Sequence, residues 1–329
     1  MKGVLLALST VFVWAILNVA NRYCVLEFDI NIILFTSLMI FATGTSLMLI
    51  REQVEPQKWK SRVKYSWLYT LLQIIRSFTM ISTFLYITST ETSILFNIEI
   101  IITYILAFAI FKRIPYKLDY IGILLILTGF ILFIFSLPTH IRLLVSILVT
   151  VSATASCLRS VIIEKTTLLD PSATVRQKCG ISGYTMFYGG LILLGFLFLV
   201  ALFKYIMADH LPTFLFILTY LPDLKTMFHP GTIITACIAG FFLNATTTYL
   251  YYATLKYSKS ETFMAIRAFQ PVMTYGLELL AAIFYAAMRP ELSTKDYILG
   301  GVIVLGSFLI LIIPQKGGYT HQSKTFITD

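Results

Sequence analysis

Five charged side chains lie inside stretches that are otherwise apolar enough to cross a lipid bilayer: Arg76, Glu99, Arg159, Arg267 and Glu278. A charge at the centre of a membrane helix costs about 2.5–3.5 kcal/mol even on the most lenient scale. Such residues are kept where they face a protected polar interior rather than lipid. The sequence therefore predicts a membrane protein with a hydrophilic site built into its middle.

The composition agrees with a membrane protein. Of the 329 residues, 58% are hydrophobic and only 12% are charged, whereas a soluble domain carries about 25% charged residues. The apolar residues form long runs and do not alternate with polar ones as in a β-barrel. A spanning helix needs about 20 residues. We expect an all-α integral membrane fold with ten spans, at residues 3–21, 31–50, 65–87, 91–111, 118–136, 141–163, 181–204, 231–255, 260–287 and 296–314.

Two apolar segments allow alternatives. The run at 211–221 is too short to span, so we interpret it as an interfacial segment, with a re-entrant element as the alternative. The first span resembles a signal peptide but has no small-residue cleavage site, which favours an ordinary span.

Enzyme and metal sites are not predicted. The sequence has no H-E-x-x-H, G-x-S-x-G, P-loop or G-x-G-x-x-G motif. Its four histidines fall in predicted loops or the tail, and its four cysteines form no C-x-x-C pair. We therefore expect no catalytic residue, no metal and no cofactor.

The basic residues predict the orientation. Sixteen Lys and Arg residues lie on the side that holds both termini, and six lie on the other side. Cytoplasmic loops carry the excess of such residues, so both termini are expected in the cytoplasm. The net charge of +9 is then explained by topology, and no nucleic-acid partner is expected.

A labelling experiment tests this orientation. A cysteine placed at Lys58 should be protected from a membrane-impermeant reagent added outside, whereas one placed at Lys225 should react. Labelling of position 58 from outside would overturn the orientation.

The chain also repeats itself. Residues 88–92 (TSTET) precede the fourth span as residues 258–262 (SKSET) precede the ninth, and Asp119-Tyr120 is matched by Asp296-Tyr297. Because five spans is an odd number, the second copy enters the membrane from the opposite side. Inverted repeats of this kind are typical of secondary transporters. We predict two five-helix repeats, 1–137 and 138–315, around a central cavity, followed by a cytoplasmic tail, 316–329.

These motifs resemble a known family. The stretch 252–262 (YATLKYSKSET), the later Gln270-Pro271 and the early Trp14-Ala15 are similar to the EamA-like branch of the drug/metabolite transporter superfamily. The resemblance implies ten spans in two halves. Two features depart from it: the fourth span has Glu99-Ile-Ile and no proline, and Lys112-Arg113 replaces an acidic residue.

Polar residues at three- and four-residue spacing predict which helix faces line the cavity. In span three, Arg76 lies about 15 Å deep at 1.5 Å per residue, either in the cavity or in a structural pair with Glu99. The predicted substrate-binding residues are Trp14, Asn18, Arg76, Phe96, Asn97, Glu99, Ser156, Asn244, Tyr251, Arg267, Gln270 and Glu278.

Charges of both signs in these spans favour a zwitterionic substrate. The predicted function is a secondary transporter that works by alternating access. The resemblance extends in overall character to the S-adenosylmethionine uptake carriers of intracellular bacteria, which implies a bacterial inner membrane and exchange of S-adenosylmethionine for S-adenosylhomocysteine. An amino-acid or general metabolite exporter is the alternative, and a channel or an intramembrane enzyme is disfavoured. The expected partners are a small molecule and the bilayer, and the protein is expected to be a monomer or a homodimer.

Overall fold

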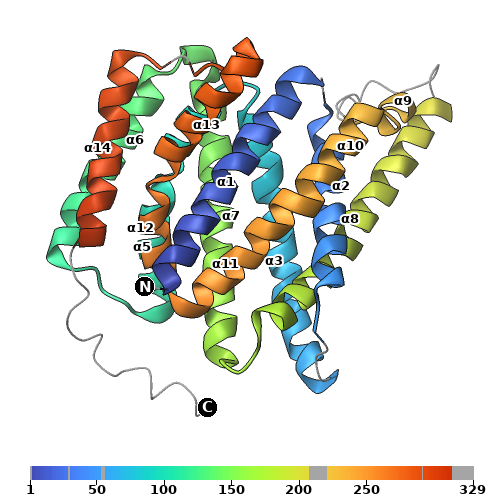
Figure 1. The fold of residues 1–329 in the computed structure, drawn as a ribbon, viewed down its shortest axis with the longest axis horizontal. Coiled ribbons are helices and arrows are strands. Elements are labelled where there is room, and N and C mark those ends of the chain that lie inside the picture. The colour runs from blue at the N-terminus through green and yellow to red at the C-terminus, as the bar shows by residue number, and fades with distance from the viewer. Residues whose placement is uncertain (1, 29, 53–55, 207–220, 291, 313–329) are drawn as a thin grey trace.

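The computed structural model describes residues 2–28, 30–52, 56–206, 221–290 and 292–312 (Figure 1). Every regular element in these residues is helical. In chain order the elements are α1 (Lys2–Glu27), α2 (Ile32–Leu49), α3 (Pro56–Thr83), α4 (Ser89–Leu95), α5 (Ile98–Phe111), α6 (Lys117–Ser136), α7 (Thr139–Leu169), α8 (Val175–Ile206), α9 (Leu224–Met227), α10 (Pro230–Ile238), η2 (Ala239–Asn244), α11 (Ala245–Tyr257), α12 (Ser260–Arg267), α13 (Gln270–Phe284), η3 (Ala286–Met288) and α14 (Thr294–Ile312).

The described helices follow the predicted segments. Each of the ten segments coincides with one helix or with two or three helical elements in series, and the largest displacement is at α3, which begins at Pro56 rather than at 65. Seven of these helical units are long and apolar enough to cross a membrane. The all-helical membrane fold is thus confirmed for the described residues, while the count of ten spans and their inverted repeat stay predictions. The segment 211–220 and the tail 316–329 lie outside the described residues.

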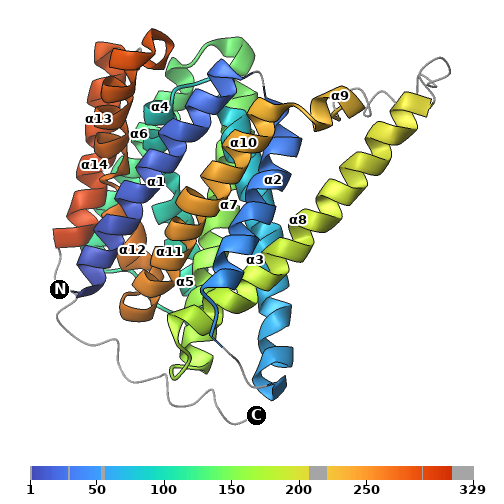
Figure 2. The same ribbon diagram turned by 45° about the vertical axis from the view of Figure 1, so that its right-hand side comes forward.

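The helices run side by side in one bundle (Figure 1). Two closely packed pairs form its flanks, α6 with α14 and α2 with α8, and α3 packs along α7 between them. The N-terminus lies at the end of the bundle where α3 begins and α7 ends. We call this end the terminal side and the other the far side. Figure 2 shows α8 leaning away from the bundle toward its far-side end.

Glycines allow the flanking pairs to approach closely. A methyl group on Gly44 of α2 would overlap the backbone of Phe187 in α8, and one on Gly190 would lie 2.7 Å from the Cα atom of Phe41. In the other pair, a methyl group on Gly306 would lie 2.8 Å from the carbonyl oxygen of Gly122. Small residues let membrane helices pack backbone to backbone, where van der Waals contact replaces the missing hydrophobic force.

Two glycines of α8 give a matched test of this packing. Gly190→Ala is expected to destabilise the protein by about 1–3 kcal/mol, because the added methyl group overpacks a backbone contact. Gly195→Ala, with no atom within 4 Å of the new methyl group, should be neutral or stabilising by up to about 1 kcal/mol. The free energy of unfolding in mixed micelles checks both. Equal effects of the two substitutions would contradict the close contact between α2 and α8.

Candidate functional site

Four of the predicted intramembrane charges meet in the middle of the bundle. Arg76 comes from α3, Arg159 from α7, Arg267 from the end of α12 and Glu99 from the first turn of α5. All four side chains are buried, and none of the residues is more than 5% exposed. We call these four residues the central cluster.

Glu99 pairs with Arg267 and not with Arg76. The Glu99 carboxylate forms an ion pair with the Arg267 guanidinium and accepts a hydrogen bond from Ser156 at 3.2 Å. Arg267 also donates from Nε to the Gln270 side chain at 2.7 Å. The alternative in which Arg76 pairs with Glu99 is therefore wrong. Which arginine faces Glu99 depends on how each helix is rotated about its own axis. The spacing of residues in the sequence does not define that rotation.

The other two arginines have no carboxylate partner among the described residues. The guanidinium of Arg76 lies 5.0 Å from the ring centre of Trp14, and its Nε and Nη2 atoms are buried without a hydrogen-bond partner. Arg159 donates to the Tyr69 hydroxyl at 2.7 Å and lies 5.4 Å from the ring centre of Tyr251, but its Nε and Nη1 atoms lack partners. The cluster thus holds three cations against one anion.

Aromatic side chains line one wall of the cluster. Trp14 of α1 packs against Tyr251 and Phe263, with ring centres 5.3 and 5.7 Å away. Arg267 lies 4.4 Å from the ring centre of Trp14 and 5.6 Å from that of Phe96. The faces of these rings offset part of the buried positive charge. Phe263 was missed, although its place one turn before Arg267 on α12 could have signalled it.

The remaining predicted residues divide between the cluster and its surroundings. Asn18 is buried, with both side-chain polar atoms unpartnered. Asn244 instead joins helices, donating to Thr43 at 2.8 Å and accepting from Gln73 at 3.4 Å. The structure therefore places Asn244 in a separate hydrogen-bonded group between η2, α2 and α3.

Glu278 lies in a second ionic group on the far side, which we call the far-side joint. Its Oε1 atom accepts from Arg22 at 2.5 Å and from the Ser89 backbone N–H at 2.9 Å. Its Oε2 atom accepts from the Thr90 backbone N–H at 3.1 Å and from the Thr90 hydroxyl. Glu278 therefore binds the positive N-terminal end of α4, where a carboxylate is favoured by the helix dipole.

Arg22 lies just beyond the predicted first span at 3–21, but the structure places it as a buried residue of α1. It also donates to the Met288 carbonyl oxygen at 3.2 Å. Its position four residues after Asn18, on the same helix face, was the available signal.

A matching ionic group lies on the terminal side, which we call the terminal-side joint. Arg113, which follows α5, donates to Glu261 at 2.9 Å and to Glu164 at 2.5 Å. Glu164 also accepts from the Ser260 backbone N–H at 3.0 Å, at the N-terminal end of α12. Burial alone would lower the pKa of Arg113, but the carboxylates of Glu261 and Glu164 outweigh it and hold that pKa above its ordinary value. Each joint thus ties the start of a short helix to other parts of the bundle.

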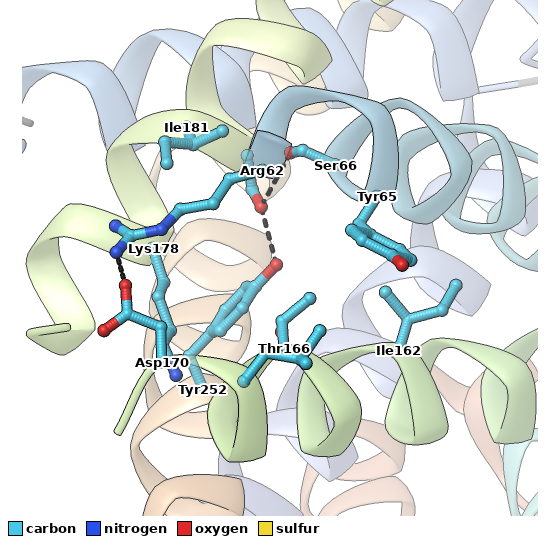
Figure 3. A pocket seen from close by; sticks show the side chains of 11 residues that line it. Arg62, Tyr65, Ser66, Ile162, Thr166, Asp170, Lys178, Ile181 and Tyr252 are labelled. Atoms are coloured by element: carbon cyan, nitrogen blue, oxygen red, sulfur yellow. Dashed lines mark hydrogen bonds and ion pairs between the residues drawn. The ribbon is translucent and has the colours of Figure 1, made fainter. Parts of the chain in front are cut away.

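The central cluster is closed, but an open vestibule approaches it from the terminal side. The cavity at Glu99 and Arg267 has a volume of only about 10 Å³, room for one water at most. The vestibule, between α3, α7, α8 and α11, has a volume of about 420 Å³ (Figure 3). Among the described residues no group of three or more His, Cys, Asp or Glu side chains could hold a metal ion.

Comparison with known protein families finds a match for the first part of the chain. The model of the EamA-like transporter family matches residues 1–135, which span α1 to most of α6. The chain is thus similar to the EamA-like transporter family over these residues. The expected resemblance is confirmed over residues 1–135, and the long apolar helices agree with a multi-pass membrane protein.

The fold of this chain is shared by solved structures. One of them, described only as "Crystal structure of protein", has 12% sequence identity and a TM-score of 0.57. The alignment covers 96% of this chain and 99% of the other. At that identity the likeness shows the fold alone. No curated protein matches the sequence.

The predicted fourth span is interrupted although it contains no proline. The helix α4 ends at Leu95 and α5 begins at Ile98, and the Asn97 side chain donates to the Ser93 and Ile94 carbonyl oxygens at 3.3 and 3.1 Å. These carbonyls lie at the end of α4, where the asparagine amide adds a side-chain donor to the last turn of the helix. The predicted ninth span is also interrupted, between α12 and α13, just before Pro271.

Proposed function

We propose that this protein is a carrier that moves a small organic anion across the membrane by alternating access. The observation that supports the proposal is the central cluster, in which three buried guanidinium groups face a single carboxylate. A buried charge without a partner is heavily penalised. A substrate carboxylate or phosphate would supply the partner that Arg76 and Arg159 lack.

The roles of the cluster residues follow from their contacts. The free nitrogens of Arg76 and Arg159 are donors for the substrate's anionic group, and charge-assisted hydrogen bonds of this kind are the strong ones. Arg267 is held by Glu99 and Gln270, so it serves as a fixed wall of the site. Trp14 and Phe96 offer ring faces to the rest of the substrate.

Alternating access is supported by the matched interruptions and joints. The fourth and ninth spans, the latter running through α12 and α13, each begin with a short helix, break in the middle and resume beside the cluster. Each short helix has its N-terminal backbone bound by a carboxylate, Glu278 on the far side and Glu164 on the terminal side. Broken helices around a central site are the usual design of inverted-repeat carriers. Opening one joint while the other stays closed would expose the cluster to one side at a time.

The contacts also rank the substrates. S-adenosylmethionine carries a carboxylate, an ammonium and a sulfonium group, so it needs two anionic partners. The sequence offered Glu99 and Glu278, but Glu278 is occupied by Arg22 and the start of α4. We therefore favour a dicarboxylate or phosphate ester, then an amino acid whose ammonium group meets Glu99. Exchange of S-adenosylmethionine for S-adenosylhomocysteine remains the third candidate.

A ligand screen tests the proposal. Purified protein is heated with succinate, 3-phosphoglycerate, glutamate, S-adenosylmethionine, adenosine or spermidine. A ligand that binds the native state raises the unfolding temperature. At a ligand concentration of a hundred times Kd, the native state is stabilised by about 2.7 kcal/mol. We expect a rise with at least one of the acids and none with adenosine or spermidine. A rise with spermidine or adenosine alone would overturn the anion site.

A counterflow experiment tests the mechanism. Proteoliposomes loaded with the unlabelled hit should take up the labelled hit transiently above equilibrium, as a carrier does. Uptake that neither saturates nor responds to internal substrate would indicate a channel.

A further inference from the structure

The vestibule on the terminal side is a largely apolar chamber that also carries hydroxyl groups and charged side chains. Its walls carry hydroxyl groups from α3, α7, α8 and α11, and its charged residues are Arg62, Lys178 and Asp170. Figure 3 shows the Arg62 guanidinium turned toward Asp170, with which it forms an ion pair. The lining therefore has two cations against one anion.

Lys178 is the unusual member of this lining. It is only 8% exposed, and its ammonium group donates to the Thr167 hydroxyl at 2.7 Å. No carboxylate bonds to it within the part of the chain that the structure describes. Lys256, which donates to the Ala173 carbonyl oxygen at 3.2 Å, adds a further positive charge at this end of the bundle. A buried ammonium group without a counter-ion, facing an open chamber, is a partner for an anion.

A layer of tyrosines separates the vestibule from the central cluster. Tyr252 lines the vestibule, and its hydroxyl is hydrogen-bonded to Ser182 at 2.6 Å. Its ring lies 5.5 Å from that of Tyr69, whose hydroxyl accepts from Arg159. Tyr252 thus stands between the vestibule and Tyr69, and Tyr69 contacts Arg159 of the central cluster.

We infer that the vestibule is a second anion-binding site, in which Lys178 and Arg62 hold the transported anion before it passes the Tyr69–Tyr252 layer to Arg159. This inference rests on the proposed function, because it takes the same substrate class. It adds a stage: the substrate is first held on the terminal side and then transferred. Cations on the path focus the field within a low-dielectric channel and raise the local concentration of anions.

A cysteine probe tests the vestibule without knowledge of the substrate. Thr166 lines the chamber and is half-buried, so Thr166→Cys is treated with 2-sulfonatoethyl methanethiosulfonate, an anion, and with its trimethylammonium analogue, a cation. Each rate is divided by that of the same reagent with free 2-mercaptoethanol. The unsubstituted chain gives the background from its four native cysteines. We expect the anionic reagent to be favoured by about tenfold at low ionic strength.

Charge substitutions identify the residues responsible. Lys178→Gln should remove most of the preference for the anionic reagent, and Asp170→Asn should increase it. Arg176→Gln is the matched control, since Arg176 lies two residues earlier on α8 but outside the vestibule lining, with a side chain 61% exposed. It should leave the preference unchanged.

The outcomes separate this inference from the proposed function. Equal rates for both reagents, or no reaction with either, would overturn the vestibule site even where Arg76 proves essential for transport. A preference for the anionic reagent that Lys178→Gln removes would support the site even where the ligand screen finds no acid that binds the cluster.

Discussion

Arg76→Gln is expected to abolish transport without lowering the stability of the unliganded protein. The substituted arginine is buried, two of its nitrogens have no partner, and Arg159 and Arg267 lie close enough to repel it. Removing its charge relieves that repulsion but deletes a substrate contact. Losing one partner of a buried charge pair costs about 2–5 kcal/mol, so uptake of the best acid from the screen should fall about thirtyfold or more. Uptake by proteoliposomes and the unfolding midpoint in detergent check the two parts.

Arg267→Gln is the matched contrast within the same cluster. It leaves Glu99 buried without its ion-pair partner, so both transport and the unfolding midpoint should fall. Arg176→Gln, a surface substitution, should change neither. Transport that persists in Arg76→Gln would contradict the proposed anion site. A loss of stability equal to that of Arg267→Gln would show Arg76 to be structural.

Glu278→Ala is expected to lower the free energy of unfolding by about 3–5 kcal/mol, the usual cost of breaking a buried ion pair from one side. The substitution leaves the Arg22 charge buried and removes the acceptor for two backbone N–H groups at the start of α4. Titration of the folded protein with dodecyl sulfate measures the change. The double substitution Arg22→Met and Glu278→Met should recover part of the loss, because no unpaired charge remains.

An exposed pair provides the control for Glu278. Asp223, whose side chain is 67% exposed, forms an ion pair with Lys204, and Asp223→Ala should cost less than about 1 kcal/mol. If Glu278→Ala were as mild as Asp223→Ala, the far-side joint would not hold α4 in place.

The helices could be predicted closely because apolar composition alone marks a membrane span. The unit α10 to α11, Pro230–Tyr257, matches the predicted span at 231–255 to within two residues at each end. The start of α3 at Pro56 was less predictable, since its first turns carry Lys and Arg residues with no apolar signal.

The sequence predicted which charged residues belong to the candidate site, but it did not predict which of them form ion pairs. Arg76, Glu99, Arg159 and Arg267 were identified by the cost of a charge in lipid, and the structure brings all four together. Which carboxylate meets which arginine depends on contacts across the whole chain, such as the 256 residues that separate Arg22 from Glu278. The break at Asn97 was equally hidden, because a hydrogen bond to two carbonyls has no pattern in the sequence.

The glycine contacts on the two flanks constrain how such a molecule can change shape. Where α2 meets α8, and α6 meets α14, backbone touches backbone, so neither pair can slide without separating main chains. The breaks at 96–97 and 268–269 interrupt the helices that lie between these flanks. Under the proposed function, the pairs α2–α8 and α6–α14 would keep their arrangement during transport. The interrupted helices α4–α5 and α12–α13 would move. A crosslink within either flanking pair should leave transport intact, whereas a crosslink across either break should stop transport.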